Sequence, residues 1–251
     1  MGEVGAAADA AKRAGGLPFR LADSEARRLR ARSLAFDDAQ PAPERVGALE
    51  ALFLAEPERA DLGLDLAVAL GRAGKTEAAL SILERVRQLV SSAATTARDP
   101  RLDLTEADLA YRFGEFQRSA AAAERARTRA VELGSKPLAI RARRHFAEAS
   151  LRLDRRDEAM AQLDEVARDA STLGMPREAG AARGALGWIQ ARVASNEVSK
   201  ATLEQALVDI RRAGDARLEA LAESDLALVS AKEGAFDTAI ERSGRALALS
   251  R

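Results

Sequence analysis

The sequence lacks cysteine and has little of the chemistry on which catalytic and metal sites depend. Its 251 residues include no Cys, one His, one Trp and one Tyr. The absence of cysteine excludes disulfides, thiolate nucleophiles and zinc–sulfur sites. A Ser–His pair stays formally open, but no nucleophile elbow, glycine-rich phosphate loop or metal-ligand spacing accompanies His145. We therefore predict no catalytic residue, no metal and no cofactor, and a protein that is not an enzyme.

An excess of charge of one sign and long apolar runs are also missing. The chain has 39 Lys and Arg against 39 Asp and Glu, a formal net charge of +0. A nucleic-acid binder normally carries a basic excess that displaces counterions, and the same balance disfavours a polybasic membrane surface. No apolar run approaches the ~18 residues of a transmembrane helix, and the N-terminus lacks the apolar region of a signal peptide. We expect a cytoplasmic protein without nucleic-acid or membrane partners.

What the sequence does contain is a 40-residue repeat. Steps of 40 back from Gly234 reach Ala194, Asp154, Gly114 and Gly74, each between two expected helices. Two other phases hold only small residues: Ala67, Ala107, Ala147, Gly187 and Ala227 in one, and Ala79, Ser119, Ala159, Ser199 and Ala239 in the other. Small side chains allow helix axes to approach to ~8–10 Å. The pattern is typical of stacked helical pairs that cross at these residues.

The expected organisation is an all-α stack behind an N-terminal segment. We predict a flexible or frayed segment over 1–19, a divergent helical pair that caps the stack over 20–59, and five repeats over 60–99, 100–139, 140–179, 180–219 and 220–251. Gly134, Gly174 and Gly214 follow helices at the position that glycine favours as a C-cap. Pro137 and Pro176 come soon after, in the first turn of the next helix, where proline is tolerated.

Residues at fixed repeat phases carry a family resemblance. They are Leu226-Ala227, Gly234, Phe236, Ala239-Ile240 and Ala246-Leu247 in the last repeat, Leu186-Gly187, Leu203 and Ala206 in the fourth, and Leu66-Ala67, Gly74, Ala79-Leu80 and Leu83 in the first. On these residues the chain from Ala60 to its end resembles the tetratricopeptide repeat family, in the longer-helix variants found in bacterial regulators and signalling scaffolds. Asp154 departs from the family pattern, since a turn glycine is expected there. The resemblance implies a right-handed α-solenoid, a superhelix of stacked antiparallel helix pairs.

The resemblance also implies a binding surface, because in this family the first helix of each pair lines a concave groove. The predicted groove residues are Arg101, Asp108, Tyr111, Arg112, Arg141, Arg144, His145, Glu148, Arg152, Trp188 and Arg192. The same face includes Ala181, Gly184 and Ala185 in the fourth repeat, and Ser224, Asp225, Leu228 and Lys232 in the fifth. We predict a non-catalytic scaffold that binds a peptide or helix of a partner protein, in bacterial signalling or regulation.

Five basic residues form a column at 40-residue steps: Arg72, Arg112, Arg152, Arg192 and Lys232. Two interpretations stay open. Cations near a helix C-terminus are favoured by the helix dipole; alternatively, the column and its neighbours attract an acidic partner segment. Asp108 and Glu148 stand near the places where the chaperone-binding members of the family have asparagines, so that particular clamp is not expected.

Trp188 is either an open platform for a ligand side chain or a packing residue among small neighbours. His145 is either a groove contact or a solvated surface residue. The other acidic residues share helix faces with arginines, a pattern usually found on solvated surfaces. Two alternative functions also remain: self-association to a homo-oligomer through the last helix, 235–250, which lacks a polar capping helix, and a small-molecule sensor with its site at Trp188.

Overall fold

The computed structural model describes residues 25–26, 29, 33, 42–92 and 99–250. These residues form α-helices and no strand, which confirms the all-α prediction. The segment predicted over 1–19, and most of the first helix of the pair predicted over 20–59, lie outside the described residues. The division into a capping pair and five repeats stays a prediction.

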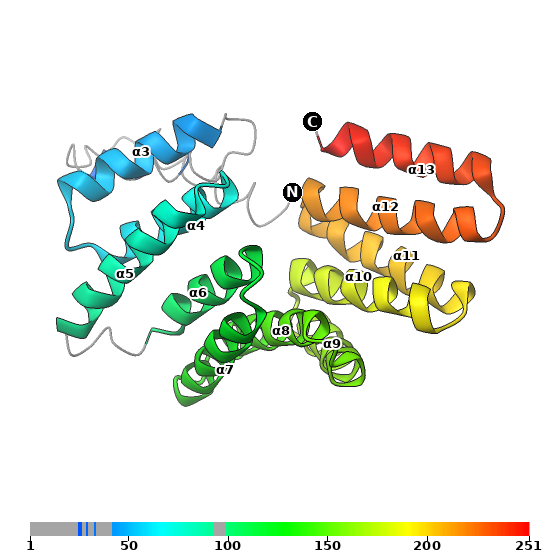
Figure 1. Cartoon of the computed structure of the whole chain (residues 1–251), viewed down its shortest axis with the longest axis horizontal. Coiled ribbons are helices and arrows are strands. Elements are labelled where there is room, and N and C mark those ends of the chain that lie inside the picture. The colour runs from blue at the N-terminus through cyan, green and yellow to red at the C-terminus, as the bar shows by residue number, and fades with distance from the viewer. Residues whose placement is uncertain (1–24, 27–28, 30–32, 34–41, 93–98, 251) are drawn as a thin grey trace. The chain divides into compact units, whose positions relative to one another are not determined.

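The chain separates into two compact units between Gly134 and Ser135, each drawn with its helices in Figure 1. The N-terminal unit contains α3 (Ala42–Ala55), α4 (Ala60–Arg72), α5 (Thr76–Ser92), α6 (Pro100–Arg112) and α7 (Phe116–Glu132). The C-terminal unit contains α8 (Lys136–Arg152), α9 (Arg156–Thr172), α10 (Pro176–Val193), α11 (Asn196–Ala213), α12 (Ala216–Lys232) and α13 (Phe236–Leu249). We call α4, α6, α8, α10 and α12 the A helices, and α5, α7, α9, α11 and α13, each packed on the A helix before it, the B helices.

The 40-residue period appears directly in the helix bounds. The B helices begin at residues 76, 116, 156, 196 and 236. The A helices of the C-terminal unit begin at 136, 176 and 216, whereas those of the N-terminal unit begin at 60 and 100. The early starts of α8 and α10 coincide with Pro137 and Pro176 in their first turns, where the fixed φ of proline favours a helix start.

The turns between helices rely on left-handed backbone conformations. Six glycines have positive φ, at Gly74, Gly114, Gly134, Gly174, Gly214 and Gly234, which confirms their predicted places in turns and C-caps. In the third repeat Asp154 stands in place of the turn glycine and adopts the same conformation, with φ of 62°. Ala194 instead is extended, with φ of −122°. The next residue, Ser195, begins α11 as an N-cap that accepts a hydrogen bond from the amide of Val198 at 3.3 Å.

The two phases of small residues lie where A and B helices cross. All ten are buried except Ala239 on α13, which is partly exposed. Ser119 Oγ donates to the carbonyl of Ala107, and Ser199 Oγ to the carbonyl of Gly187, both at 2.8 Å. A Cβ on Gly187 would lie 2.6 Å from Leu203 Cγ. Steric limits at the crossing therefore explain why these positions hold only small residues.

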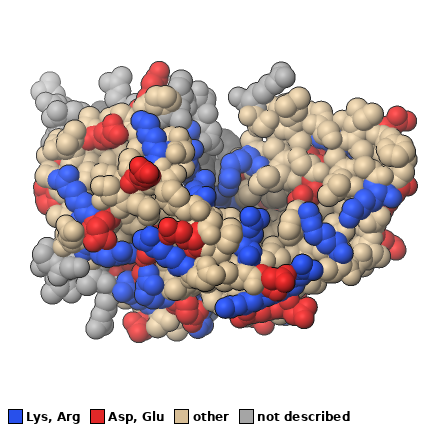
Figure 2. Space-filling model, viewed as in Figure 1, with Lys and Arg blue, Asp and Glu red and all other residues tan. Residues whose placement is uncertain are grey.

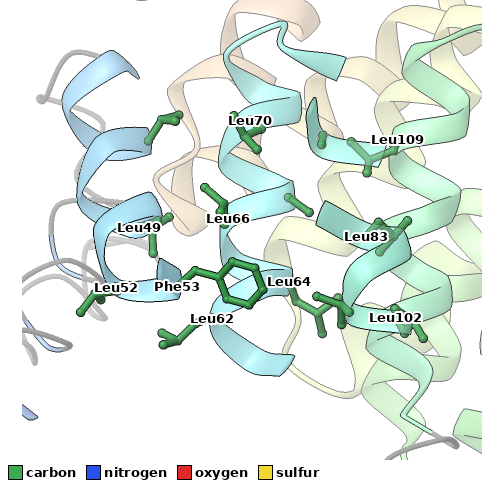
Figure 3. Packing of buried hydrophobic residues seen from close by; sticks show 14 of the residues in the cluster. Leu49, Leu52, Phe53, Leu62, Leu64, Leu66, Leu70, Leu83, Leu102 and Leu109 are labelled. Carbon is green, nitrogen blue, oxygen red and sulfur yellow. The ribbon is translucent and has the colours of Figure 1, made fainter. Parts of the chain in front are cut away.

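The composition of the core changes within each unit, and in the N-terminal unit the contact of α6 with α7 contains buried alanines such as Ala107, Ala122 and Ala126. In the N-terminal unit, leucines surround Phe53 of α3, as Figure 3 shows, and the Phe53 ring lies beside Gly63 of α4. In the C-terminal unit, alanines supply much of the core between α8 and α10, whereas leucine, isoleucine and valine form most of the core between α10 and α12. Helices of the C-terminal unit thus approach closely, and polar groups at their contacts need partners.

Candidate protein-binding face

Four of the predicted groove residues lie on α6 in the N-terminal unit: Arg101, Asp108, Tyr111 and Arg112. Each has a contact within its own unit. Arg101 pairs with the N-cap aspartate of α6 at 2.6 Å, and Arg112 Nε donates to Asp108 at 2.9 Å. The Tyr111 ring meets the Phe116 ring edge-on, with centroids 5.6 Å apart. Their role in binding stays a prediction.

The other seven lie on α8 and α10, and they extend to α12 through four positions that recur every 40 residues. These are Arg141, His145, Glu148 and Arg152 on α8, then Ala181, Ala185, Trp188 and Arg192 on α10, and Leu221, Asp225, Leu228 and Lys232 on α12. Steps of four, three and four residues keep each set on one side of its helix. Because α10 packs against both α8 and α12, we name these twelve residues, with Arg144 and Gly184 beside them, the A-helix face.

On the α8 side of this face, arginines surround a buried carboxyl group. Glu178, whose side chain is only 3% exposed, is bound by Arg144 Nε at 2.7 Å and by Arg141 and Arg177 at 3.3 Å. Burial opposes ionisation of Glu178, but the charges of Arg144 and Arg177 outweigh it and lower its pKa to about 2. Arg144 also donates to Glu148, and these two carboxylates raise the pKa of Arg144 against the effect of burial. Arg144 therefore joins α8 to α10.

His145 is largely buried, with 14% of its side chain exposed. Its Nδ1 lies 3.7 Å from Glu148, and its Nε2 lies 3.3 Å from a guanidinium nitrogen of Arg144. These contacts do not fit the interpretation of His145 as a solvated surface residue. They make it part of the polar network at the α8–α10 contact.

Trp188 is partly buried against the core that joins α8 to α10. The guanidinium carbon of Arg192 lies 3.5 Å from the centroid of the Trp188 ring, and Arg192 Nη1 donates to the Trp188 carbonyl at 2.8 Å. Lys232 donates to the carbonyl of Ala191 at 2.6 Å. These two members of the basic column therefore bind carbonyls in the C-terminal part of α10, which supports the structural interpretation for them.

The α12 side of the face differs, because its carboxyl group has no partner. Within the described part of the chain, Asp225 makes no hydrogen bond or ion pair. Burial raises its pKa to about 6, and the charge of Arg192 offsets this only in part. Leu221 and Leu228, one turn to each side on the same helix face, are 52% and 43% exposed. Gly184 on α10 is also open, since an added Cβ would meet nothing within 4 Å.

The expectation that the remaining acidic residues are solvated is wrong for five of them. Asp103, Glu106, Glu178, Asp209 and Glu223 are buried. In the sequence these five residues resemble surface residues, because most of their basic partners lie on other helices. At such depth an unpaired carboxylate is costly, so these groups persist as ion pairs.

The pairs between A and B helices follow the repeat. Residues 40 apart on four successive A helices pair with residues 22 or 26 positions later: Asp103 with Arg125 and Arg129, Arg143 with Glu165 and Asp169, Arg183 with Asp209, and Glu223 with Arg245. The acid is on the A helix in the first and last pairs and on the B helix in the middle two. Opposite charges at these separations were the sequence signal that could have revealed the contacts.

The described surface has no large region of one charge sign on the side that Figure 2 displays, where basic and acidic side chains are interspersed. Within residues 42–92 and 99–250, no three His, Cys, Asp or Glu side chains gather as a metal site would require. No helix in these ranges has an apolar stretch long enough to span a bilayer.

The sequence matches no protein-family model, and it matches no curated protein. Solved structures are similar. A Rap protein complexed with competence and sporulation factor aligns with 99% of this chain and 77% of its own, at 12% identity and a TM-score of 0.72. BtubC from P. vanneervenii aligns over 100% and 92% of the two chains, at 18% identity and a TM-score of 0.60.

A third similar structure is described as the nearly identical TPR-like repeats of a putative kinesin light chain from Podosopora anserina. It aligns with 77% of this chain and 95% of its own, at 16% identity and a TM-score of 0.56. At sequence identities this low, the similarity to these structures concerns the fold and not the function. Together with the 40-residue helix period and the left-handed turns, it establishes that this chain has the fold of tetratricopeptide-repeat proteins.

Proposed function

We propose that the chain is a non-catalytic interaction scaffold, and that the A-helix face of its C-terminal unit binds a segment of another protein. The observation that carries this proposal is the exposure of Leu221 and Leu228 on either side of a carboxyl group without a partner. Grouped exposed apolar side chains often mark protein-binding surfaces. The partly buried indole of Trp188, on the adjacent helix, adds a residue type that is common at energetically dominant contacts.

The similar structures lend support to a binding role. The Rap protein mentioned above was solved in complex with competence and sporulation factor, so a related arrangement of helices is able to hold a ligand. The same likeness favours a role in bacterial signalling or regulation. The cytoplasmic location and the absence of nucleic-acid and membrane partners remain part of this proposal.

A selection from displayed peptides tests the binding face. Random peptides are selected on the wild type and then measured on two variants by fluorescence anisotropy of the labelled peptide. Leu221→Gln with Leu228→Gln should abolish binding, because the apolar contact is lost. Val208→Gln, on α11 of the same unit, is the matched control, since Val208 is 56% exposed but lies away from the face. Equal binding by the wild type and both variants would contradict the proposed face.

Self-association is a second candidate function, and a separate observation favours it. Phe236, Ile240 and Leu247 on α13 are 66%, 70% and 56% exposed. An apolar row of this kind suits a contact with a second copy. Light scattering of the wild type beside Ile240→Glu tests it: a dimer that dissociates in the variant supports self-association, and a monomeric wild type at high concentration contradicts it.

A further inference from the structure

The α12 side of the A-helix face has a defined spacing of chemical groups. Leu221, Asp225 and Leu228 follow one another along one side of the helix. With a rise of about 1.5 Å per residue, the two leucines lie about 10 Å apart along the axis, with the carboxyl group between them. A ligand that covers both leucines therefore also covers Asp225.

Within the described residues, the charge of Arg192 favours the ionised form of Asp225, but it offsets the effect of burial only in part. The pKa of Asp225 is raised to about 6 by burial, so this residue is mostly ionised at neutral pH. Described residues donate no hydrogen bond to it. A partly buried acceptor without a donor is unfavourable, and covering it with an apolar ligand would make it more so. A ligand that binds here must therefore bring a donor, and a cationic donor gives the strongest bond.

The cations of the face itself are already engaged. Arg141 and Arg144 bind Glu178, while Arg192 and Lys232 donate to backbone carbonyls of α10. The group that lacks a partner is the carboxylate. The charge that the site can accept from outside is therefore positive.

In the N-terminal unit, the aspartate at the same repeat position lies near a cation on the next A helix. Asp65 on α4 lies four repeats before Asp225. The pKa of Arg101, on the next A helix, is raised first by its hydrogen bonds to Asp99, and the charges of Asp61 and Asp65 add to this. The cation near Asp225 is Arg192 of the preceding A helix, which lowers the pKa of Asp225 through its charge. Arg192 donates its hydrogen bond to the Trp188 carbonyl and none to Asp225.

We propose that Asp225 receives a lysine or arginine side chain from an amphipathic helix of another protein, with apolar residues on that helix covering Leu221 and Leu228. This rests on the proposed function and specifies its partner. Two apolar residues seven apart, with the basic residue between them, reproduce the spacing on α12. At this contact the partner is basic, in contrast to the acidic segment expected from the arginine column.

The test begins with selection from helical peptides that are randomised on one face. The wild type should enrich peptides with lysine or arginine between two apolar residues. If selected peptides bind Leu221→Gln with Leu228→Gln as well as the wild type, the proposed binding face fails. If they require the leucines but lack a basic residue, or carry an acidic one, the face stands and the inference about Asp225 is overturned.

A double-mutant cycle then assigns the contact. In the best selected peptide, replacing the basic residue by norleucine should weaken binding to the wild type by about tenfold or more, since a charge-assisted hydrogen bond is lost. The same replacement should have less than about a twofold effect on Asp225→Asn. Selection on Asp225→Lys should enrich glutamate or aspartate at that peptide position. Equal effects of norleucine on the wild type and Asp225→Asn would overturn the inference, and circular dichroism confirms that both variants are folded.

Discussion

Glu178 and Asp225 both carry carboxyl groups on A helices of the same unit, but only Glu178 has ion-pair partners that account for its burial. Glu178 is bound by three arginines, and its pKa is about 2. Asp225 has no bound donor among the described residues, and its pKa is about 6. The glycines of α10 differ in the same way. A Cβ at Gly187 would collide with Leu203, whereas one at Gly184 would meet nothing within 4 Å.

The comparison separates what the fold requires from what it tolerates. Residues at helix contacts have partners that account for their type, whereas Asp225 and Gly184 each cost stability without a compensating contact. Residues of this second kind are candidates for function, because sites that bind or react often retain unfavourable groups.

The largest effect is expected at Glu178. Glu178→Gln removes the buried carboxylate that Arg141, Arg144 and Arg177 share, and should lower the free energy of unfolding by about 3–5 kcal/mol at pH 7. Because the pKa of Glu178 is lowered when folded, its contribution is complete above its unfolded pKa of about 4.5 and is lost as the pH falls toward 2. Urea unfolding measures the loss. Glu165→Gln, at an exposed ion pair, is the control with less than about 1 kcal/mol; an equal loss in both would contradict the role of Glu178.

The next effect is steric. Gly187→Ala forces Leu203 or its helix to move and should cost about 1–3 kcal/mol. The cost should appear as a lower midpoint in urea with an unchanged dependence on denaturant. A Gly187→Ala variant as stable as the wild type would show that the crossing of α10 and α11 is less tight than described.

Asp225→Asn should stabilise the protein by about 1–2 kcal/mol at pH 8, a value discounted because water still reaches part of the side chain. Because the folded pKa of Asp225 is raised, its favourable contribution is present below the unfolded value of about 3.8 and is lost as the pH rises through 6. The difference between variant and wild type should therefore grow from pH 4 to pH 8. Thermal melts across this range check it, and a variant less stable at pH 8 would mean that Asp225 has a structural partner.

The smallest effect is expected at the other open position. Gly184→Ala should raise stability by about 0.5–1 kcal/mol, because alanine favours the helix and its methyl group has free space. Gly184→Leu should keep the fold but place a bulky side chain on the A-helix face, and should therefore weaken the binding of selected peptides. Loss of stability in Gly184→Ala would show that the glycine serves packing after all.

Much of the fold was predictable because its signals are local or periodic. The turn glycines and the small residues at helix crossings were found from the 40-residue period alone. Asp154 was identified as an exception to the turn glycine, but only the structure showed that it adopts the left-handed conformation that glycine would supply. Side chains of Asp and Asn tolerate that conformation better than most residues.

The site was predicted less completely, for a physical reason. The repeat phase placed Asp225 and Leu228 on the A-helix face, which Leu221 shares, but whether a carboxylate is paired depends on which arginines reach it. Glu178 was not singled out at all, although three of its neighbours in sequence or space are arginines. Its partners Arg141 and Arg144 lie on the preceding A helix, 37 and 34 positions away, separations at which one sequence gives no local pattern.

Titration of the Asp225 carboxyl group by carbon-13 NMR tests the open state of α12 most directly. We expect a midpoint near pH 6 in the free protein and a fall of at least about one pH unit when a selected basic peptide is bound, since a nearby cation favours the ionised form. A midpoint below pH 4 in the free protein would show that Asp225 already has a partner within the chain, and would contradict the assignment of α12 as an open binding face.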